Sequence, residues 1–205
     1  MRIKSIHYFS GIVISVFVAF HLLNHASSVF GAEQHIAVME LFRVVYRNVF
    51  VETLLLAAVL VQIITGLWLF NKGRKWATTF FEKLQIWSGL YLAIFFVIHL
   101  SAVLGGRLVL HLDTNFYFGV AGLNTFPFNL FFIPYYGLAV LSFFGHIAAI
   151  HQRKMKPSVL GLSPTAQSKF MLGFGLLFTL FLFYGLTNHF QSVEIPAAYG
   201  VLVGK

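Results

Sequence analysis

Two histidines occupy the same place in two copies of a short pattern. One copy runs from Phe9 to Leu22 and the other from Trp87 to Leu100, 78 residues later. Each copy has Ser-Gly, nine largely apolar residues and then His-Leu. An imidazole can bind a transition metal or carry a proton, so His21 and His99 are the first candidates for a functional site.

The composition places these histidines in a membrane protein. The chain has 205 residues, of which 59% are hydrophobic and 10% are charged. Soluble domains have about 25% charged residues. The absence of cysteine excludes disulfides, thiolate-bound clusters and covalently attached c-type haem. The excess of 14 basic over 6 acidic residues is assigned to membrane topology rather than to nucleic-acid binding.

Five apolar segments are long enough to cross a hydrocarbon core of about 30 Å. A backbone in lipid must satisfy its own hydrogen bonds, so each segment is predicted to be helical. The predicted fold is an all-α integral membrane bundle that forms one domain over residues 1–205. The predicted spans are residues 6–25, 50–70, 84–104, 131–151 and 170–189.

The positions of the basic residues predict the orientation. With alternating connections, ten basic residues fall on one side of the bundle: Arg2, Lys4, Lys72, Arg74, Lys75, Lys83, Arg153, Lys154, Lys156 and Lys169. The other side has Arg43, Arg47, Arg107 and Lys205. The positive-inside rule then puts the N-terminus in the cytoplasm and predicts a multi-pass protein of the cell inner membrane. The first segment resembles a secretory signal, but His21 inside it and the lack of a clear Ala-x-Ala site indicate a retained helix.

The duplicated pattern also predicts where the two histidines lie. The first two spans correspond to the third and fourth, and the repeat preserves direction. His21 and His99 each lie 15 residues into their spans, about 22 Å from the inner boundary at 1.5 Å per residue. Two imidazoles at one level can take the axial positions of a haem iron, packed by the phenylalanine one turn before each. The alternative is that each imidazole bonds a backbone carbonyl or the other histidine.

Three further histidines are weaker candidates. His25 lies one turn beyond His21 and could be an alternative iron ligand, a contact of the haem propionates, or half of a metal-chelating pair. His189 ends the last span on the outer side. His146 lies near the cytoplasm, where Gln62 is its nearest equivalent in the first repeat. We interpret His146 as a satisfied polar residue or part of a small-molecule pocket.

The first outer connection predicts a short helix on the surface. Glu40, Arg43 and Arg47 share one helical face, so residues 35–47 are interpreted as an amphipathic segment. Glu52, at the start of the second span, is expected to form a salt bridge with Arg47 or another outer basic group.

The remaining connections contain fewer signals. Residues 105–130 are compatible with an ordered lid or with a plain long loop. Ser163-Pro164 fits a helix N-cap and first turn. Gly173 and Gly175 are expected to let the last helix approach a neighbour closely.

Two short openings carry a resemblance to a known family. Residues 4–11 (Lys-Ser-Ile-His, then Ser-Gly) and residues 84–89 (Leu-Gln-Ile-Trp-Ser-Gly) resemble the helix-one and helix-three openings of the five-helix cytochrome b anchors of succinate dehydrogenases and fumarate reductases. The resemblance implies that His21 and His99 are the ligands of the distal haem. It also implies that His146 is the helix-four ligand of a proximal haem.

The sequence departs from the family pattern at two positions. Gln62 stands where the helix-two ligand is expected, and Ile86 stands where the family has an arginine. One haem b is therefore predicted, with two as the alternative. The resemblance further implies a quinone and soluble redox subunits as partners, in addition to the lipid bilayer, and a homo-oligomer is compatible with it.

Three functions follow as alternatives. The preferred one is a b-type cytochrome that transfers electrons between a quinone and a partner protein, as a subunit of a quinone-linked oxidoreductase. The second is a membrane non-haem metalloenzyme built on His21, His25, His99 and His189. The third is a cofactor-free structural subunit. His35 is expected to lie outside the site, so that its replacement leaves a haem spectrum unchanged.

Overall fold

The computed structural model describes residues 3–205, in which five helices are long and apolar enough to cross a membrane. They are α1 (Ile3–Ala26), α3 (Val49–Gly73), α4 (Phe80–Leu108), α6 (Asn129–Lys154) and α7 (Pro164–Leu186). The predicted all-α bundle of five spanning helices is confirmed, and the chain is a multi-pass membrane protein.

Except at the end of α7, the helices extend beyond the predicted segments, because the apolar stretch is shorter than the run of helical hydrogen bonds. Thr79 begins α4 with a capping box shared with Glu82. Ser163 caps α7 by accepting a hydrogen bond from the Ala166 amide at 3.3 Å, as predicted. The prediction that the last span runs from 170 to 189 is wrong at both ends. Residues 188–190 have positive φ angles, so His189 lies in a left-handed turn after the helix.

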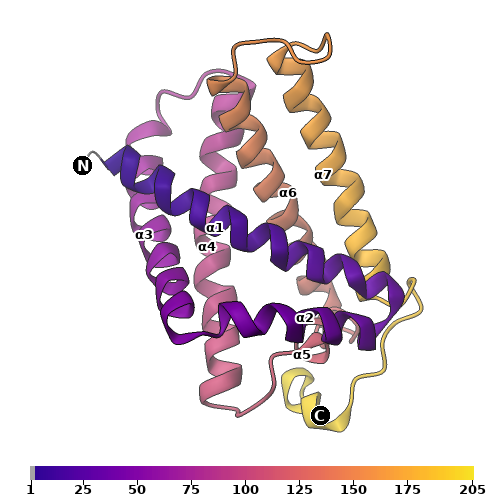
Figure 1. Cartoon of the computed structure of the whole chain (residues 1–205). Coiled ribbons are helices and arrows are strands. Elements are labelled where there is room, and N and C mark those ends of the chain that lie inside the picture. The colour runs from indigo at the N-terminus through magenta and orange to yellow at the C-terminus, as the bar shows by residue number, and fades with distance from the viewer. Residues whose placement is uncertain (1–2) are drawn as a thin grey trace.

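The first helix crosses the others obliquely (Figure 1). The remaining four spans pack in the order α3, α4, α6, α7. α1 contacts α3 near its start, where His7 Nδ1 lies 2.8 Å from Thr65 Oγ1. At its end α1 reaches α7, and Ser28, just after α1, lies against Gly185. α1 therefore passes in front of α4 and α6. The prediction assumed upright helices, but His21 of the oblique α1 still lies level with His99 of α4, as predicted.

Four short helices gather at the end opposite the α3–α4 and α6–α7 connections (Figure 1). They are η1 (Ser27–Phe30), α2 (Ala32–Tyr46), α5 (Phe116–Val120) and η2 (Ala197–Val203). Phe116, Val120, Ala121 and Leu123 are almost completely buried. Residues 105–130 therefore form an ordered part of this group of helices rather than a plain loop. We call the group the outer cap, after the orientation that the basic residues predict.

The α2 helix is amphipathic, as predicted, but Arg43 on its charged face points inward, while Glu40 of the same face stays exposed. Arg43 is buried, whereas Leu41, Val44 and Val45 are exposed. Exposed apolar side chains are expected where the surroundings are lipid. A buried arginine there is expected to find its partners inside the protein.

The small residues of α7 have different roles from those predicted. A Cβ on Gly175 would lie 2.6 Å from Phe144 Cβ, so the predicted close approach of this glycine to α6 is correct. No described side chain or neighbouring backbone atom lies within 4 Å of a Cβ placed on Gly173, so that prediction is wrong. Gly185 makes the second close approach, to Ser28 and Val29.

Candidate functional site

The rings of His21 and His99 meet edge-on in the space between α1 and α4. Their centroids are 6.2 Å apart and their planes are inclined by 70°. Each ring stacks on the phenylalanine one turn before it. Phe17 and His21 are 5.7 Å apart, and Phe95 and His99 are 5.0 Å apart. The duplicated sequence pattern thus forms the same stacked unit twice, and the two units meet.

A chain of imidazoles continues outward from this pair. His21 Nε2 and His25 Nε2 share a hydrogen bond of 3.1 Å, and His25 Nδ1 and His35 Nε2 share one of 3.2 Å. Asn24 Nδ2 donates to His35 Nε2 at 3.3 Å. Asn24 Oδ1 and His35 Nδ1 are buried without a hydrogen-bond partner among residues 3–205. The site therefore contains buried polar groups that the surrounding protein does not fully satisfy.

The expectation that His35 lies outside the site is wrong. Gly31, with φ 106°, turns the chain between η1 and α2. This turn brings His35 against His25 of α1, with ring centroids 5.3 Å apart, and against Phe116 of α5 at 5.1 Å. The residue is 2% exposed. Burial, followed by the nearby His21 and Arg43, lowers the pKa of His35 to about 4.

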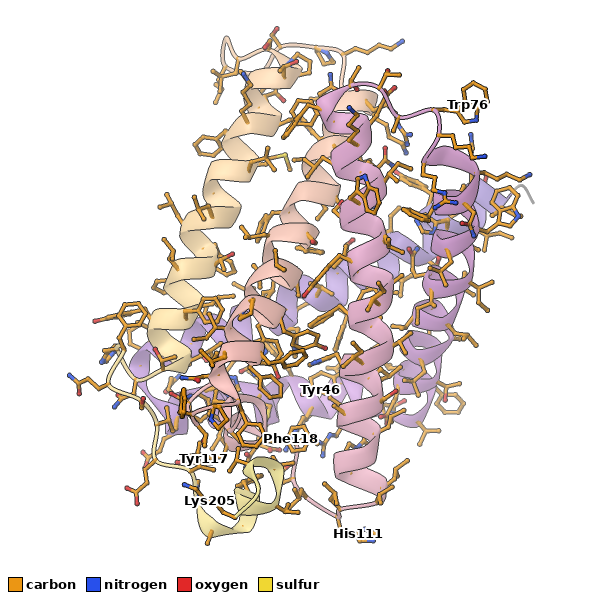
Figure 2. All side chains as sticks on the ribbon, turned by 180° about the vertical axis from the view of Figure 1, so that it is seen from behind. Tyr46, Trp76, His111, Tyr117, Phe118 and Lys205 are labelled. Atoms are coloured by element: carbon orange, nitrogen blue, oxygen red, sulfur yellow. The ribbon has the colours of Figure 1, made fainter. Side chains whose placement is uncertain are left out.

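Two tyrosines complete the aromatic surroundings, and sequence reasoning missed both. Tyr46, labelled in Figure 2, contacts Phe17 edge-on at 5.6 Å. Tyr136 of α6 contacts His99 edge-on at 6.5 Å. In the sequence, Tyr46 stands near the end of the amphipathic segment, and Tyr136 belongs to a tyrosine pair that follows Pro134.

Ion pairs fix the outer cap over the histidines. Arg43 Nη2 lies 2.7 Å from Asp113 Oδ1, and Arg43 Nη1 lies 2.6 Å from Glu40 Oε1. Burial opposes ionisation of Arg43, but the hydrogen bond and charge of Asp113 outweigh it, so its pKa is raised. Glu52 pairs with Arg107. The prediction that Glu52 joins an outer basic group is therefore correct, with Arg107 rather than Arg47 as the partner.

His146 lies apart from the other candidate residues. Its Nδ1 is 3.2 Å from Ser88 Oγ and 3.0 Å from the Gln85 carbonyl oxygen. A Cβ on Gly89 would lie 3.0 Å from His146 Cε1. Its polar contacts favour the interpretation of a satisfied residue.

The first repeat makes the matching contact. Gln62 Nε2 donates to Ser10 Oγ at 2.9 Å and also to the backbone oxygen of His7. A Cβ on Gly11 would lie 3.0 Å from Gln62 Nε2. In both repeats the Ser-Gly pair therefore receives a polar side chain from the following span, as the weak match between Gln62 and His146 suggested.

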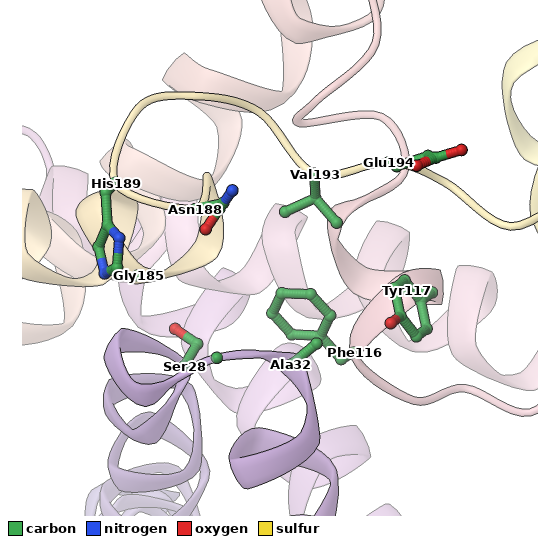
Figure 3. A pocket seen from close by; sticks show the side chains of 10 residues that line it. Ser28, Ala32, Phe116, Tyr117, Gly185, Asn188, His189, Val193 and Glu194 are labelled. Carbon is green, nitrogen blue, oxygen red and sulfur yellow. The ribbon is translucent and has the colours of Figure 1, made fainter.

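His189 lines a pocket at the outer surface rather than joining the histidine chain. Its Nε2 donates to the Val29 carbonyl oxygen at 3.2 Å. The pocket has a volume of about 220 Å³, and Asn188, Glu194 and Phe116 also line it (Figure 3). The structure thus brings together His21, His25 and His99 with His35, and leaves His146 and His189 elsewhere.

The centroid separation of the central pair matches that of two imidazoles on one iron, while His21 Nε2 is directed at His25. Two opposed imidazoles that bind one metal ion each form a metal–nitrogen bond of about 2 Å. With the distance from each nitrogen to its ring centre added, the centroids are roughly 6 Å apart. His21 and His99 are only partly buried although they lie in the middle of the bundle. α1 packs closely on α3 and α7, with few close backbone approaches to α4 or α6. Within residues 3–205, no group of three or more His, Cys, Asp or Glu side chains is arranged to hold a metal ion. A haem needs only two axial side chains.

The fold and site define the chain as a multi-pass helical membrane protein with a cluster of four histidines on α1, α2 and α4. No protein-family model, curated protein or solved structure matches it.

Proposed function

We propose that the protein is a membrane b-type cytochrome in which His21 and His99 are the axial ligands of one haem. The observation that carries the proposal is the approach of two phenylalanine-stacked imidazoles from equivalent positions of a repeat, 6.2 Å apart. The resemblance of the two helix openings to the cytochrome b anchors of succinate dehydrogenases and fumarate reductases supports it.

The residues around the pair have distinct tasks. His21 Nε2 would give up its hydrogen bond with His25 to bind iron, and His25 would keep its hydrogen bond with His35. Phe17, Phe95 and Tyr136 exclude water and hold the imidazole planes. A bound haem supplies one-electron chemistry, and its potential is set by the ligands and by the dry surroundings.

The proposed role is electron transfer between a quinone in the bilayer and a partner protein in the cell inner membrane. The position of the pair within a lipid-embedded bundle supports a lipid-soluble redox partner. Association with soluble redox subunits accords with the resemblance, as a subunit of a quinone-linked oxidoreductase.

An optical spectrum of the detergent-purified protein tests the proposal. We expect a reduced b-type band in the unmodified protein and its loss in His21→Ala and in His99→Ala, because each removes an axial ligand. His111, which lies in the outer connection and is exposed (Figure 2), provides the matched control: His111→Ala should keep the band. A colourless protein that retains full helicity contradicts the proposal and favours the cofactor-free structural subunit.

A second candidate is the non-haem metalloenzyme, favoured by the chain of imidazoles. The 3.1 Å between His21 Nε2 and His25 Nε2 is short enough for both nitrogens to bind one ion. Elemental analysis separates the two: zinc or iron without porphyrin, lost in His25→Ala, supports the metalloenzyme. Iron in equal amount to porphyrin supports the cytochrome.

A further inference from the structure

The connection between α6 and α7 presents a leucine that the rest of the chain does not cover. Leu160 is 96% exposed, and it stands at the tip of a two-residue turn. The residues on either side of the tip, Val159 and Leu162, are joined by backbone hydrogen bonds of 3.2 and 3.0 Å. Both of them are exposed as well. Exposed apolar side chains that gather at one place mark a surface for interaction.

The backbone of this turn is strained at its leucine. Leu160 has a φ angle of 51°, and Gly161 has one of 76°. Positive φ at both central residues is the pattern of a type I′ turn, in which asparagine, aspartate or glycine is usual. A leucine in this left-handed region costs free energy. Packing within residues 3–205 does not offset that cost, because the side chain is exposed.

The turn is fixed at the ends of both neighbouring helices. Gln167 of α7 donates from Nε2 to the Leu162 carbonyl oxygen at 2.8 Å. Its Oε1 lies 2.8 Å from Nε2 of His151, on α6. The connection runs out past the end of α7 instead of folding back over the bundle (Figure 1). The tip therefore lies beside the helix ends, where spanning helices leave the hydrocarbon core.

The chain around the turn is basic and has no carboxylate side chain. Residues 151–169 include Arg153, Lys154, Lys156 and Lys169, and no Asp or Glu. All four basic side chains are exposed, and none forms an ion pair with any residue from 3 to 205. An apolar tip beside unpaired cations complements a surface in which acyl chains lie beneath anionic phosphates.

We propose that residues 156–162, together with Lys169, bind an anionic phospholipid of the adjacent leaflet. Leu160 enters the boundary between headgroups and acyl chains, and Lys156 and Lys169 contact the phosphate. Because Gln167 ties the turn to both helices, the bound lipid fixes the depth of α6 and α7 in the leaflet. The histidine cluster lies at the other end of the bundle, so this site is independent of the proposed haem.

Nitroxide labels on single cysteines test where the tip lies, since the chain has no cysteine of its own. In nanodiscs, the label on Leu160→Cys should collide more with oxygen than with a water-soluble nickel complex. The preference should grow when phosphatidylglycerol is added to phosphatidylcholine. His111→Cys is the matched control, because His111 is exposed, has the same φ of 51° and lies at the opposite end (Figure 2). Its label should stay accessible to nickel in both bilayers.

Two results of the labelling contradict the proposal. A Leu160→Cys label as accessible to nickel as the control label shows that lipid does not cover the tip, and a partner protein then becomes the expected cover. A Leu160→Cys label that enters both bilayers equally shows insertion without recognition of the anionic headgroup.

Titration of the detergent-purified protein with short-chain phosphatidylglycerol tests the phosphate contacts. Lys156→Gln and Lys169→Gln should each weaken binding about fivefold, the scale of one lysine at an anionic lipid surface. Lys205→Gln removes the same charge at the other end of the molecule (Figure 2) and should leave binding unchanged. Inorganic phosphate should not compete with the lipid. Competition by phosphate, or an equal loss in all three variants, overturns the proposal.

Leu160→Asn separates the lipid contact from the folding of the turn. Asparagine adopts positive φ more readily than leucine, so this variant keeps the turn. It loses the apolar tip, so phosphatidylglycerol should bind about tenfold more weakly, the scale of burying one leucine side chain. An unchanged affinity in Leu160→Asn overturns the role of the tip.

Discussion

His35 is buried deeply enough that a charge on its imidazole is unfavourable. The residue is 2% exposed and carries an unpartnered Nδ1 within the described part of the chain. His25 and His21 of α1 face it, and Arg43 lies on its own helix. From α5 the side chain that contacts it is the uncharged Phe116. A proton on His35 would therefore be desolvated and repelled by Arg43.

This conflict predicts that the outer cap weakens in acid. The pKa of His35 falls from 6.5 in the unfolded chain to about 4 when folded, mainly through burial. A depressed histidine pKa stabilises the fold above pH 6.5, and that contribution is lost as the pH falls toward 4. The shift corresponds to roughly 3 kcal/mol. His35→Gln cannot titrate, so the fall in melting temperature between pH 7 and pH 4.5, followed by circular dichroism, should be smaller in it.

The control for this measurement is His111→Gln. His111 is exposed in the outer connection, so its replacement should leave the pH dependence of the unmodified protein unchanged. The contrary result is a His35→Gln variant that loses as much stability in acid as the unmodified protein. It would show that protonation of His35 on unfolding does not contribute to the loss of stability in acid.

At the scale of elements, two glycines of one helix should respond oppositely to alanine. A Cβ on Gly185 would lie 2.7 Å from the Val29 amide nitrogen, and a backbone atom cannot move aside cheaply. Gly185→Ala should therefore destabilise the contact of α7 with η1 by about 3 kcal/mol. On Gly173 a Cβ meets no described neighbouring atom within 4 Å. Gly173→Ala should gain up to about 1 kcal/mol of helix propensity.

Unfolding in mixed detergent, followed by loss of helical circular dichroism, compares the two variants. If Gly185→Ala and Gly173→Ala changed the free energy of unfolding equally, the packing of α7 on η1 would not limit stability. Because both changes add one methyl group to the same helix, the difference between them isolates the close approach.

The elements show why some features could be predicted and others could not. The five spans were predictable because lipid requires long apolar helices, and the approach of His21 and His99 was predictable because a parallel repeat brings equivalent residues to one level. The inward position of Arg43 on α2 was not predictable. A helical period tells which residues share a face, but whether that face points into the protein depends on the partner that Arg43 finds in Asp113, 70 residues away.

The place of His35 was also beyond sequence reasoning, for a different physical reason. It depends on one glycine, Gly31, in a conformation that reverses the chain after η1. Local sequence shows that a glycine permits such a turn, but the direction in which α2 then runs is set by its packing on α5 and α1.

At the scale of the whole molecule, charge is distributed unequally between the two ends. Trp76 marks the end with the α3–α4 connection, and His111 and Lys205 mark the other (Figure 2). Arg74 and Lys75 precede Trp76, and Lys154 closes α6 at the same end with its ammonium 3.5 Å above the Tyr8 ring. The arginines of the opposite end are paired with Asp113, Glu40 and Glu52, so they add little net positive charge there.

This asymmetry predicts a cytoplasmic location for the α3–α4 connection. A fluorescent protein fused after Ala77 should be bright, and alkaline phosphatase fused there should be inactive, because each reporter folds on one side of the inner membrane. Fusions after His111 should give the reverse. Replacing Lys72, Arg74, Lys75 and Lys83 by glutamine should mix the two outcomes at Ala77, since these residues contribute to retention of the connection on the cytoplasmic side. Phosphatase activity at Ala77 in the unmodified chain would invert the orientation and move the histidine cluster to the cytoplasmic side.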